Sequence, residues 1–186
     1  MPLKGKYQKY NAALAALTVS KTLDYNNFRV IENGIKNVIK NTGLKGRYEF
    51  INKKPDIILD SAHNPEGVVN FLSEFNLHKK NYTKCSLLFG VMRDKAVKDM
   101  LAILVKNFDG IFVTSIDNKR ACKISELEEF ANEIKVNVTK VENPGQFVSD
   151  FMNEDESKCL VVLGSMYLLG NIKSHIEKLK IAWHYF

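Results

Sequence analysis

Residues 59–67 read LDSAHNPEG and place an acid, a histidine and an asparagine in one turn. They follow an apolar run, so a buried strand is expected to stop at Asp60. Pro65 is then expected to begin a helix, with Asn64 as its N-cap. A simple connector needs only residues such as Gly, Asn or Pro. An ionisable pair at the carboxyl end of a strand therefore indicates a ligand site.

Three side chains around this turn could bind a nucleotide. Asp60 can accept hydrogen bonds from the hydroxyls of a sugar or help hold a hydrated metal, or it can cap the helix at Asn64. His63 could donate to a phosphate, although a histidine in a turn is more often structural. Arg47, in KGRYEF, carries a planar fork that suits a phosphate, and its alternative is an ordinary surface arginine.

Two further side chains follow other expected strands. Lys95 comes after CSLLFGV and could bind a carboxylate, since a lysine gains nothing from the dipole at the start of a helix. Ser165 comes after CLVVLG and could present its hydroxyl to an anion, or it could be a simple N-cap. These groups suit anionic ligands, and they favour positioning and electrostatic stabilisation over covalent catalysis.

Several well-known motifs are missing from the sequence. It contains no GxGxxG, no GxxxxGK[ST] and no GxSxG, so this chain does not supply the usual phosphate-binding loop or a nucleophilic serine. Its three cysteines show no CxxC spacing, and its four histidines show no metal-ligand spacing. We therefore expect no metal site in the chain. The odd number of cysteines leaves at least one unpaired, and Cys85 and Cys159 open apolar runs and are expected to be buried, which fits a reducing compartment.

The elements that must position these residues alternate between helices and strands. Helices are expected at 8–23, 28–41, 64–75, 96–107, 125–134, 144–152 and 166–179, and strands at 56–60, 85–91, 110–115, 136–141 and 159–164. Ser125 and Glu128 are expected to form a capping box. The segment Arg47–Ile51 is expected to be an extra, antiparallel edge strand.

This alternation predicts an α/β fold with a mainly parallel sheet covered by helices on both faces. Ligands of such sheets gather outside the carboxyl ends of the strands. The expected ends at Asp60, Gly90–Lys95, Thr114-Ser115 and Gly164–Tyr167 should then share one rim. Their convergence is stronger evidence for a site than any single residue.

Composition narrows the class of protein. The chain has 186 residues, is 45% hydrophobic and carries a net charge of +6. Its lysines are scattered, which favours solvated surface charge over a nucleic-acid interface. No apolar run approaches the roughly 20 residues that span a bilayer, and the N-terminus lacks a secretory signal. We expect a cytoplasmic protein that binds neither nucleic acid nor membrane.

Five stretches carry a resemblance to a known family. GKYQKYNAALA, KGRYEF, ILDSAHNPEG, FGVMRDKAVKDML and VVLGSMYLLGNI occur in this order and together resemble folylpolyglutamate synthase and its bifunctional dihydrofolate synthase relatives, members of the Mur ligase superfamily. The resemblance implies that residues 1–186 form one Rossmann-like, three-layer C-terminal domain. It also implies a larger P-loop ATPase domain, with the Mg²⁺ ligands and most of the pterin site, which this sequence does not contain.

The resemblance also implies a reaction and nucleotide contacts. The family's enzymes use ATP to phosphorylate a folate carboxylate, and the amine of L-glutamate attacks the acyl phosphate. Asn11 would contact ATP, Arg47 its phosphates and Asp60 the ribose side. The family's His-Gln pair is replaced here by Tyr7-Gln8, which leaves the adenine contacts open.

The remaining implied roles concern the amino acid. His63 would shape the joint ATP–glutamate site, and Lys95 and Ser165 would contact the carboxylates of the incoming glutamate. The isolated chain is expected to be inactive, because domain closure builds such a site. Two other functions stay open: a stand-alone nucleotide- or amino-acid-binding module, and a Mur-type ligase domain that acts on peptidoglycan precursors. The choice between folate and dihydropteroate as acceptor also stays open.

Overall fold

The computed structural model describes residues 1–25 and 27–183. Six strands occur in these residues: β1 Glu49–Asn52, β2 Asp56–Asp60, β3 Lys84–Phe89, β4 Gly110–Val113, β5 Thr139–Lys140 and β6 Lys158–Leu163. The α-helices are α1 Lys6–Thr22, α2 Phe28–Lys36, α3 Val38–Thr42, α4 Pro65–Phe75, α5 Val97–Leu104, α6 Ile124–Glu133, α7 Pro144–Phe151 and α8 Met166–Trp183. Short 3₁₀ turns cover Lys79–Asn81 and Val105–Asn107.

The strands form one sheet in the order β1-β2-β6-β3-β4-β5. β1 pairs with β2 antiparallel, and the other pairs are parallel. The predicted fold class and antiparallel edge strand are therefore confirmed, although β1 begins at Glu49 rather than at Arg47. β5 has two residues, so the strand predicted over 136–141 was too long.

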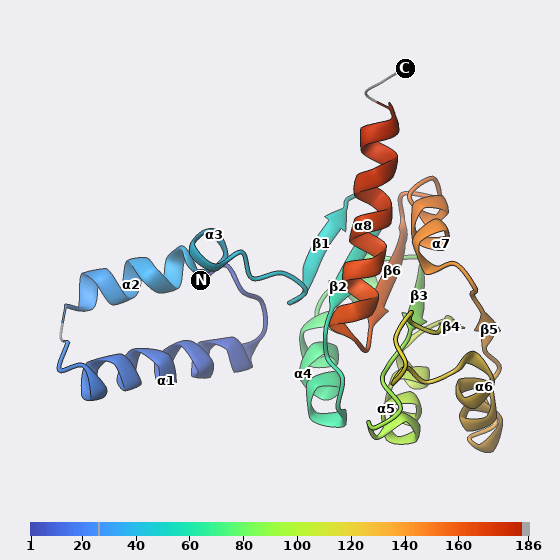
Figure 1. Cartoon of the computed structure of the whole chain (residues 1–186), viewed down its shortest axis with the longest axis horizontal. Helices are drawn as coiled ribbons and strands as arrows, with labels where there is room; N and C mark the ends of the chain where they lie inside the picture. Colours follow the sequence, from blue (N-terminus) through green and yellow to red (C-terminus); the bar gives the residue numbers. More distant parts are fainter. Residues whose placement is uncertain (26, 184–186) are drawn as a thin grey trace.

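Helices cover both faces of this sheet (Figure 1). α4, α5 and α6 pack on one face, where Phe71, Leu101 and Leu127 are buried in a single cluster. α7 and α8 pack on the other face, around Val148 and Leu168. We refer to residues 46–183 as the α/β body, and its two apolar clusters form the core of a three-layer arrangement.

Local chemistry fixes where the helices of the body begin. The side chain of Asn64 accepts from the Gly67 N–H at 2.7 Å, so α4 is capped as predicted. The capping prediction for α6 was wrong. The helix begins at Ile124, so Ser125 already lies inside the first turn, and Glu126 accepts from the Lys123 N–H at 2.7 Å.

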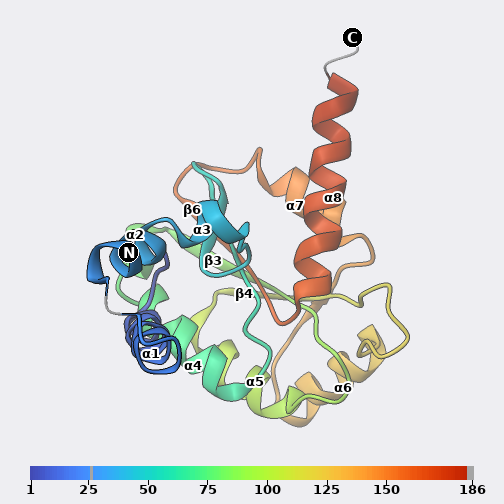
Figure 2. The same ribbon diagram turned by 60° about the vertical axis from the view of Figure 1, so that its left-hand side comes forward.

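The helices α1, α2 and α3 form a separate unit beside the body, which we call the helical hairpin (residues 1–43). Figures 1 and 2 show it at the side of the sheet that carries β1 and α4. The single helix predicted over 28–41 is divided at Asn37, whose side chain donates to the Asn33 carbonyl at 2.9 Å. None of the helices in the described residues is long and apolar enough to cross a membrane.

Candidate functional site

A cavity of about 290 Å³ lies where α1 meets the turn between β2 and α4. Its lining comes from three parts of the chain that are distant in sequence: α1, the segment that precedes β1, and the turn that leads into α4. Four of the six predicted site residues line it: Asn11, Arg47, Asp60 and His63. The structure thus brings the predicted nucleotide contacts and His63 together.

Asp60 is the buried carboxylate of this cavity. It ends β2, and its side chain is only 4% exposed. Its two oxygens accept from the Tyr48 N–H and the Ala62 N–H, each at 2.8 Å. Burial raises the pKa of Asp60 above its ordinary value, while the two N–H groups and Arg47 act in the opposite direction. Asp60 therefore does not cap α4, which was the alternative expected from the sequence.

His63 lies on the exposed side of the same turn. Its Nδ1 is 2.9 Å from the Ser61 carbonyl oxygen. A carbonyl oxygen only accepts, so Nδ1 carries the hydrogen. In the neutral ring Nε2 is then an acceptor, and this orientation leaves it available to a ligand.

The α1 side of the cavity contains residues that sequence reasoning only touched. Gln8 is the one buried residue of α1, at 6% exposure, and its amide oxygen accepts from the Asn11 side chain at 3.4 Å. Tyr7 also lines the cavity. Burial, and to a smaller extent the Asp60 carboxylate, raises the pKa of Tyr7 above its ordinary value. The burial of Gln8 on an otherwise exposed helix leaves no pattern in the sequence, so sequence reasoning had no signal for this wall.

Lys95 and Ser165 lie outside this cavity. Lys95 lies 3.1 Å from Asp94 and lines a separate open hollow of about 320 Å³ beside Arg93 and Phe130. Ser165 follows β6 and is 4% exposed, and its hydroxyl accepts from the Tyr167 N–H at 3.2 Å. The hydroxyl therefore caps the start of α8. Both residues follow parallel strands, as predicted, but the structure does not join them to Asp60 in one cavity.

Residues 46–166 match the model of the family described as Mur ligase, glutamate ligase domain. The chain belongs to this Mur ligase family. The matched region begins at the Gly46 turn and ends at the first residue of α8, so the glutamate ligase domain corresponds to most of the α/β body.

Individual relatives agree with this assignment. The chain is 27% identical over 176 residues to a dihydrofolate synthase/folylpolyglutamate synthase of Bacillus subtilis, and 26% identical over 186 residues to a probable dihydrofolate synthetase of Schizosaccharomyces pombe. These alignments cover 94% and 95% of this chain but 40% and 44% of the relatives. The chain therefore spans about two fifths of the length of these relatives.

Solved structures show the same fold. A Mycobacterium tuberculosis folylpolyglutamate synthase complexed with ADP and AMPPCP is 25% identical, with a TM-score of 0.77 over 94% of this chain and 41% of its own. Escherichia coli FolC in complex with DHPP and ADP is 23% identical, with a TM-score of 0.79 over 97% of this chain and 41% of its own. The helical hairpin is thus part of what is similar, although it lies outside the matched family model.

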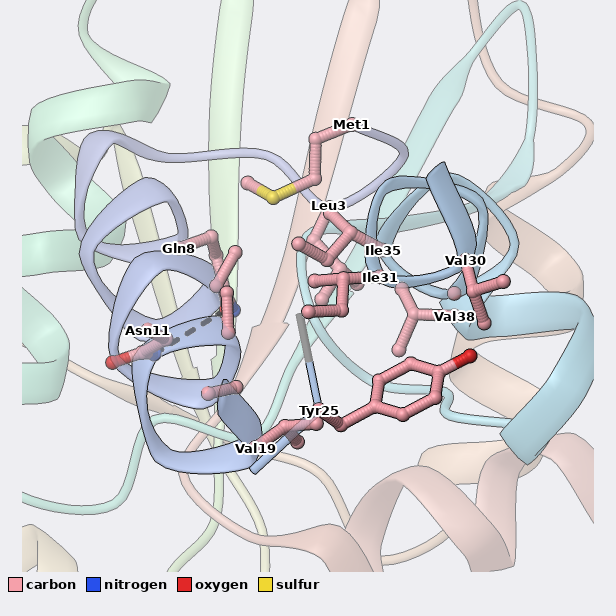
Figure 3. A pocket seen from close by; sticks show the side chains of 14 residues that line it. Met1, Leu3, Gln8, Asn11, Val19, Tyr25, Val30, Ile31, Ile35 and Val38 are labelled. Atoms are coloured by element: carbon pink, nitrogen blue, oxygen red, sulfur yellow. Dashed lines mark hydrogen bonds between the residues drawn. The ribbon is translucent and has the colours of Figure 1, made fainter. Parts of the chain in front are cut away.

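A larger hollow of about 440 Å³ lies inside the helical hairpin, between α1 and the helices α2 and α3 (Figure 3). Its walls are mainly aliphatic, with Val19, Ile31 and Ile35 among them, and no charged side chain lines it. Gln8 and Asn11 stand at one end. An uncharged hollow does not suit a phosphate. The smaller cavity at Asp60 is therefore the candidate nucleotide site.

The described residues also contain no group of three or more His, Cys, Asp or Glu side chains that could hold a metal ion. Asp60 is the one carboxylate that lines the candidate cavity, and both of its oxygens already accept backbone N–H groups. The residues of this cavity therefore do not fit a metal ion by themselves.

Proposed function

We propose that this chain supplies part of the active site of an ATP-dependent ligase that joins L-glutamate to folate or to dihydropteroate. The reaction would proceed through an acyl phosphate, which the amine of L-glutamate attacks to form an amide and release phosphate. One observation carries the proposal: Asn11, Arg47, Asp60 and His63, from three separate segments, line a single cavity in a domain of the Mur ligase family.

The cavity suits the nucleotide. The guanidinium of Arg47 would bind phosphate oxygens, because its planar fork offers several donors to an anion. Asp60 would accept from a ribose hydroxyl through the lone pairs that its backbone partners leave free. Asn11 and Tyr7 would contact the base from the α1 side.

Lys95 and Ser165 would bind the incoming glutamate. The Lys95 ammonium would exchange Asp94 for a glutamate carboxylate, at small cost because an exposed ion pair contributes little free energy. The Ser165 hydroxyl would donate to the other carboxylate while it continues to accept from Tyr167 N–H. His63 would lie between nucleotide and amino acid, with Nε2 as its polar contact.

The proposed partner is an ATPase domain with a phosphate-binding loop. The proposed Mg²⁺ would be held by that domain, since the cavity described here does not fit a metal ion. That domain would also cover the outer face of α1, where Tyr10, Leu14 and Leu17 are 77%, 64% and 56% exposed. More than half of the length of each matched relative has no counterpart in this chain.

Nucleotide binding is tested by titrating ADP with MgCl₂ into the isotopically labelled chain and following backbone amide signals. The amide signals of the turn 60–64 should shift at millimolar concentrations of ADP. Arg47→Met should raise the dissociation constant about tenfold or more, the effect of losing one charge-assisted hydrogen bond. Arg29→Met, on the exposed surface of α2, is the matched control and should change nothing. Shifts spread evenly over the surface, or equal binding by both variants, would contradict the proposal.

Ligase activity is tested in a chimera. Residues 1–186 would replace the matching segment of the Bacillus subtilis relative, and ATP-dependent incorporation of labelled L-glutamate into folate and dihydropteroate would be measured. Lys95→Met should raise the KM for glutamate. Lys106→Met, on the exposed 3₁₀ turn that follows α5, is the control and should not. Incorporation that is independent of ATP would overturn the acyl-phosphate proposal.

A further inference from the structure

The turn that presents Arg47 is held by a carboxylate three residues away from its first residue. Glu49, the first residue of β1, accepts from the Gly46 N–H through Oε2 at 2.6 Å. Gly46 is a buried residue. A buried donor that lost its acceptor would cost more free energy than an exposed one. Glu49 therefore closes the segment 46–49 into one fixed turn.

Glu49 is in turn held by Lys173 from α8. The Lys173 ammonium donates to both carboxylate oxygens of Glu49, at 2.7 and 2.6 Å. The two side chains are 18% and 27% exposed, and every other ion pair in the described part of the chain has at least one partner that is more exposed than both of them. This bridge joins the edge strand β1 to α8, the helix that starts immediately after Ser165.

The same turn is fastened to Asp60 and its neighbour. The Gly46 carbonyl accepts from the Ser61 N–H at 3.0 Å, and the Tyr48 N–H donates to Asp60 at 2.8 Å. Arg47 thus lies between two residues that are both tied to the β2–α4 turn. Within the described residues the Arg47 guanidinium makes one hydrogen bond, a weak one to the Gly46 carbonyl at 3.4 Å. Its position depends on the backbone that carries it.

That backbone is unusual on both sides of Arg47. Gly46 has a φ of +70°, and Tyr48 has a φ of +48°, which a side-chain-bearing residue rarely adopts. A side chain at position 46 would also come within 2.8 Å of Leu169 of α8. Such conformations persist where the surroundings fix them, and they gather at ligand sites. The Glu49 carboxylate and α8 are the surroundings that fix this one.

We infer that Glu49 and Lys173 are positioning residues of the nucleotide cavity. They hold the Gly46–Tyr48 turn so that the Arg47 guanidinium is in place before nucleotide binds. Because Lys173 belongs to α8, the same bridge ties the nucleotide cavity to the helix that begins beside Ser165. The inference rests on the proposed nucleotide-binding function and adds to it the residues that fix the cavity.

The test compares ADP binding, with MgCl₂, by four versions of the chain. Glu49→Ala should raise the dissociation constant about tenfold and Lys173→Met about threefold, because loss of one hydrogen bond costs roughly 0.5–1.5 kcal/mol. Glu49→Gln keeps an oxygen that can accept from Gly46 N–H and should recover most of the affinity lost in Glu49→Ala. Lys158→Met breaks the Lys158–Glu154 pair, also 2.6 Å long, at the amino end of β6, and is the control.

A second readout separates positioning from simple stability. Hydrogen exchange of the Gly46, Tyr48 and Ser61 amides should speed up in Glu49→Ala and Lys173→Met, while the melting temperature falls no further than in Lys158→Met. If Glu49→Ala does not fold, Lys173→Met, which keeps the Glu49–Gly46 bond, decides alone.

The outcomes distinguish failure of the proposed function from failure of this inference. If the unmodified chain does not bind ADP at about 10 mM, the proposed function and this inference are both overturned. Unmodified chain that binds ADP, with Glu49→Ala and Lys173→Met binding equally well, would overturn the inference alone. A loss of affinity that matches the loss of melting temperature, and is shared by Lys158→Met, would show a purely structural bridge and also overturn it.

Discussion

The α/β body and the helical hairpin differ in how far they bury their apolar residues. In the body, β2, β3 and β6 are almost wholly buried, and helices cover both faces of the sheet. In the hairpin, α2 and α3 contain no buried residue and α1 contains only Gln8. A helix that is apolar on several sides normally lies inside a larger core. The body therefore carries a complete core, whereas the hairpin has apolar surface that its own residues do not cover.

The largest expected difference concerns a core substitution. Leu88 of β3 is fully buried, so Leu88→Ala should lower the free energy of unfolding of the body by about 2–5 kcal/mol. Urea denaturation followed by far-ultraviolet circular dichroism measures this change. A cost below about 1 kcal/mol would show that the core of the body is not closely packed.

Alkaline pH should weaken the body. Burial raises the pKa of the Cys85 and Cys122 thiols to about 11, and Cys159 is also buried. An unfolded thiol ionises near pH 8.5, so between about pH 8.5 and 11 the unfolded chain releases protons that the folded chain keeps. The free energy of unfolding should therefore fall as pH rises through this window. Denaturation curves at pH 8, 9 and 10 check the direction, with Cys122→Ala expected to show a shallower fall.

All three thiols lie in the body, which gives a labelling test of the same point. At pH 8 a thiol reagent should label them only as fast as the body opens. Rapid labelling of the native chain would contradict the buried environment that raises these pKa values.

Two asparagine caps offer a matched pair with a smaller effect. The Asn143 side chain caps α7 in the body at 3.0 Å, and the Asn27 side chain caps α2 in the hairpin at 3.3 Å. Asn143→Ala should lower the free energy of global unfolding by about 1 kcal/mol. Asn27→Ala should leave global unfolding unchanged and speed hydrogen exchange only in α2. Equal effects on global unfolding would mean that hairpin and body unfold together.

The smallest effect is expected at Leu14 of α1. Its side chain is 64% exposed, so Leu14→Ala should change the free energy of unfolding of this chain by no more than about 0.5 kcal/mol. In the chimera with the ATPase domain of the Bacillus subtilis relative, the same substitution should lower the melting temperature, because the residue would then be covered. An unchanged melting temperature in the chimera would show that this face stays open there.

The sequence predicted most of the body because its signals were local and redundant. Apolar runs bounded by turns identified the strands, and Asn64-Pro65 identified the start of α4. Asp60 and His63 could be expected to share a site because they belong to one turn at the carboxyl end of a strand. Arg47 joins them because β1 is antiparallel to β2, which places the start of β1 beside the end of β2. Tyr48 N–H as a partner of Asp60 could not be predicted, because it depends on a positive φ in a non-glycine residue.

The hairpin and the rim were less predictable for a physical reason. The break at Asn37 comes from one side-chain bond to Asn33, which periodicity does not register. Lys95 and Asp60 follow different strands, and β6 lies between β2 and β3 in the sheet. Strand order is set by long-range packing, so spacing along the chain did not reveal that these two residues line different hollows.

The two edges of the sheet also bear on how copies of this chain behave when crowded. An exposed edge is a template on which another chain can add a strand. Here β1 offers four residues and is interrupted by an irregular register opposite β2, and β5 offers two residues that include Lys140. Lys53 and Lys54 follow β1 directly, where their charges oppose a second copy. Short, bent and charged edges should keep the body from growing into intermolecular β-sheet at high concentration.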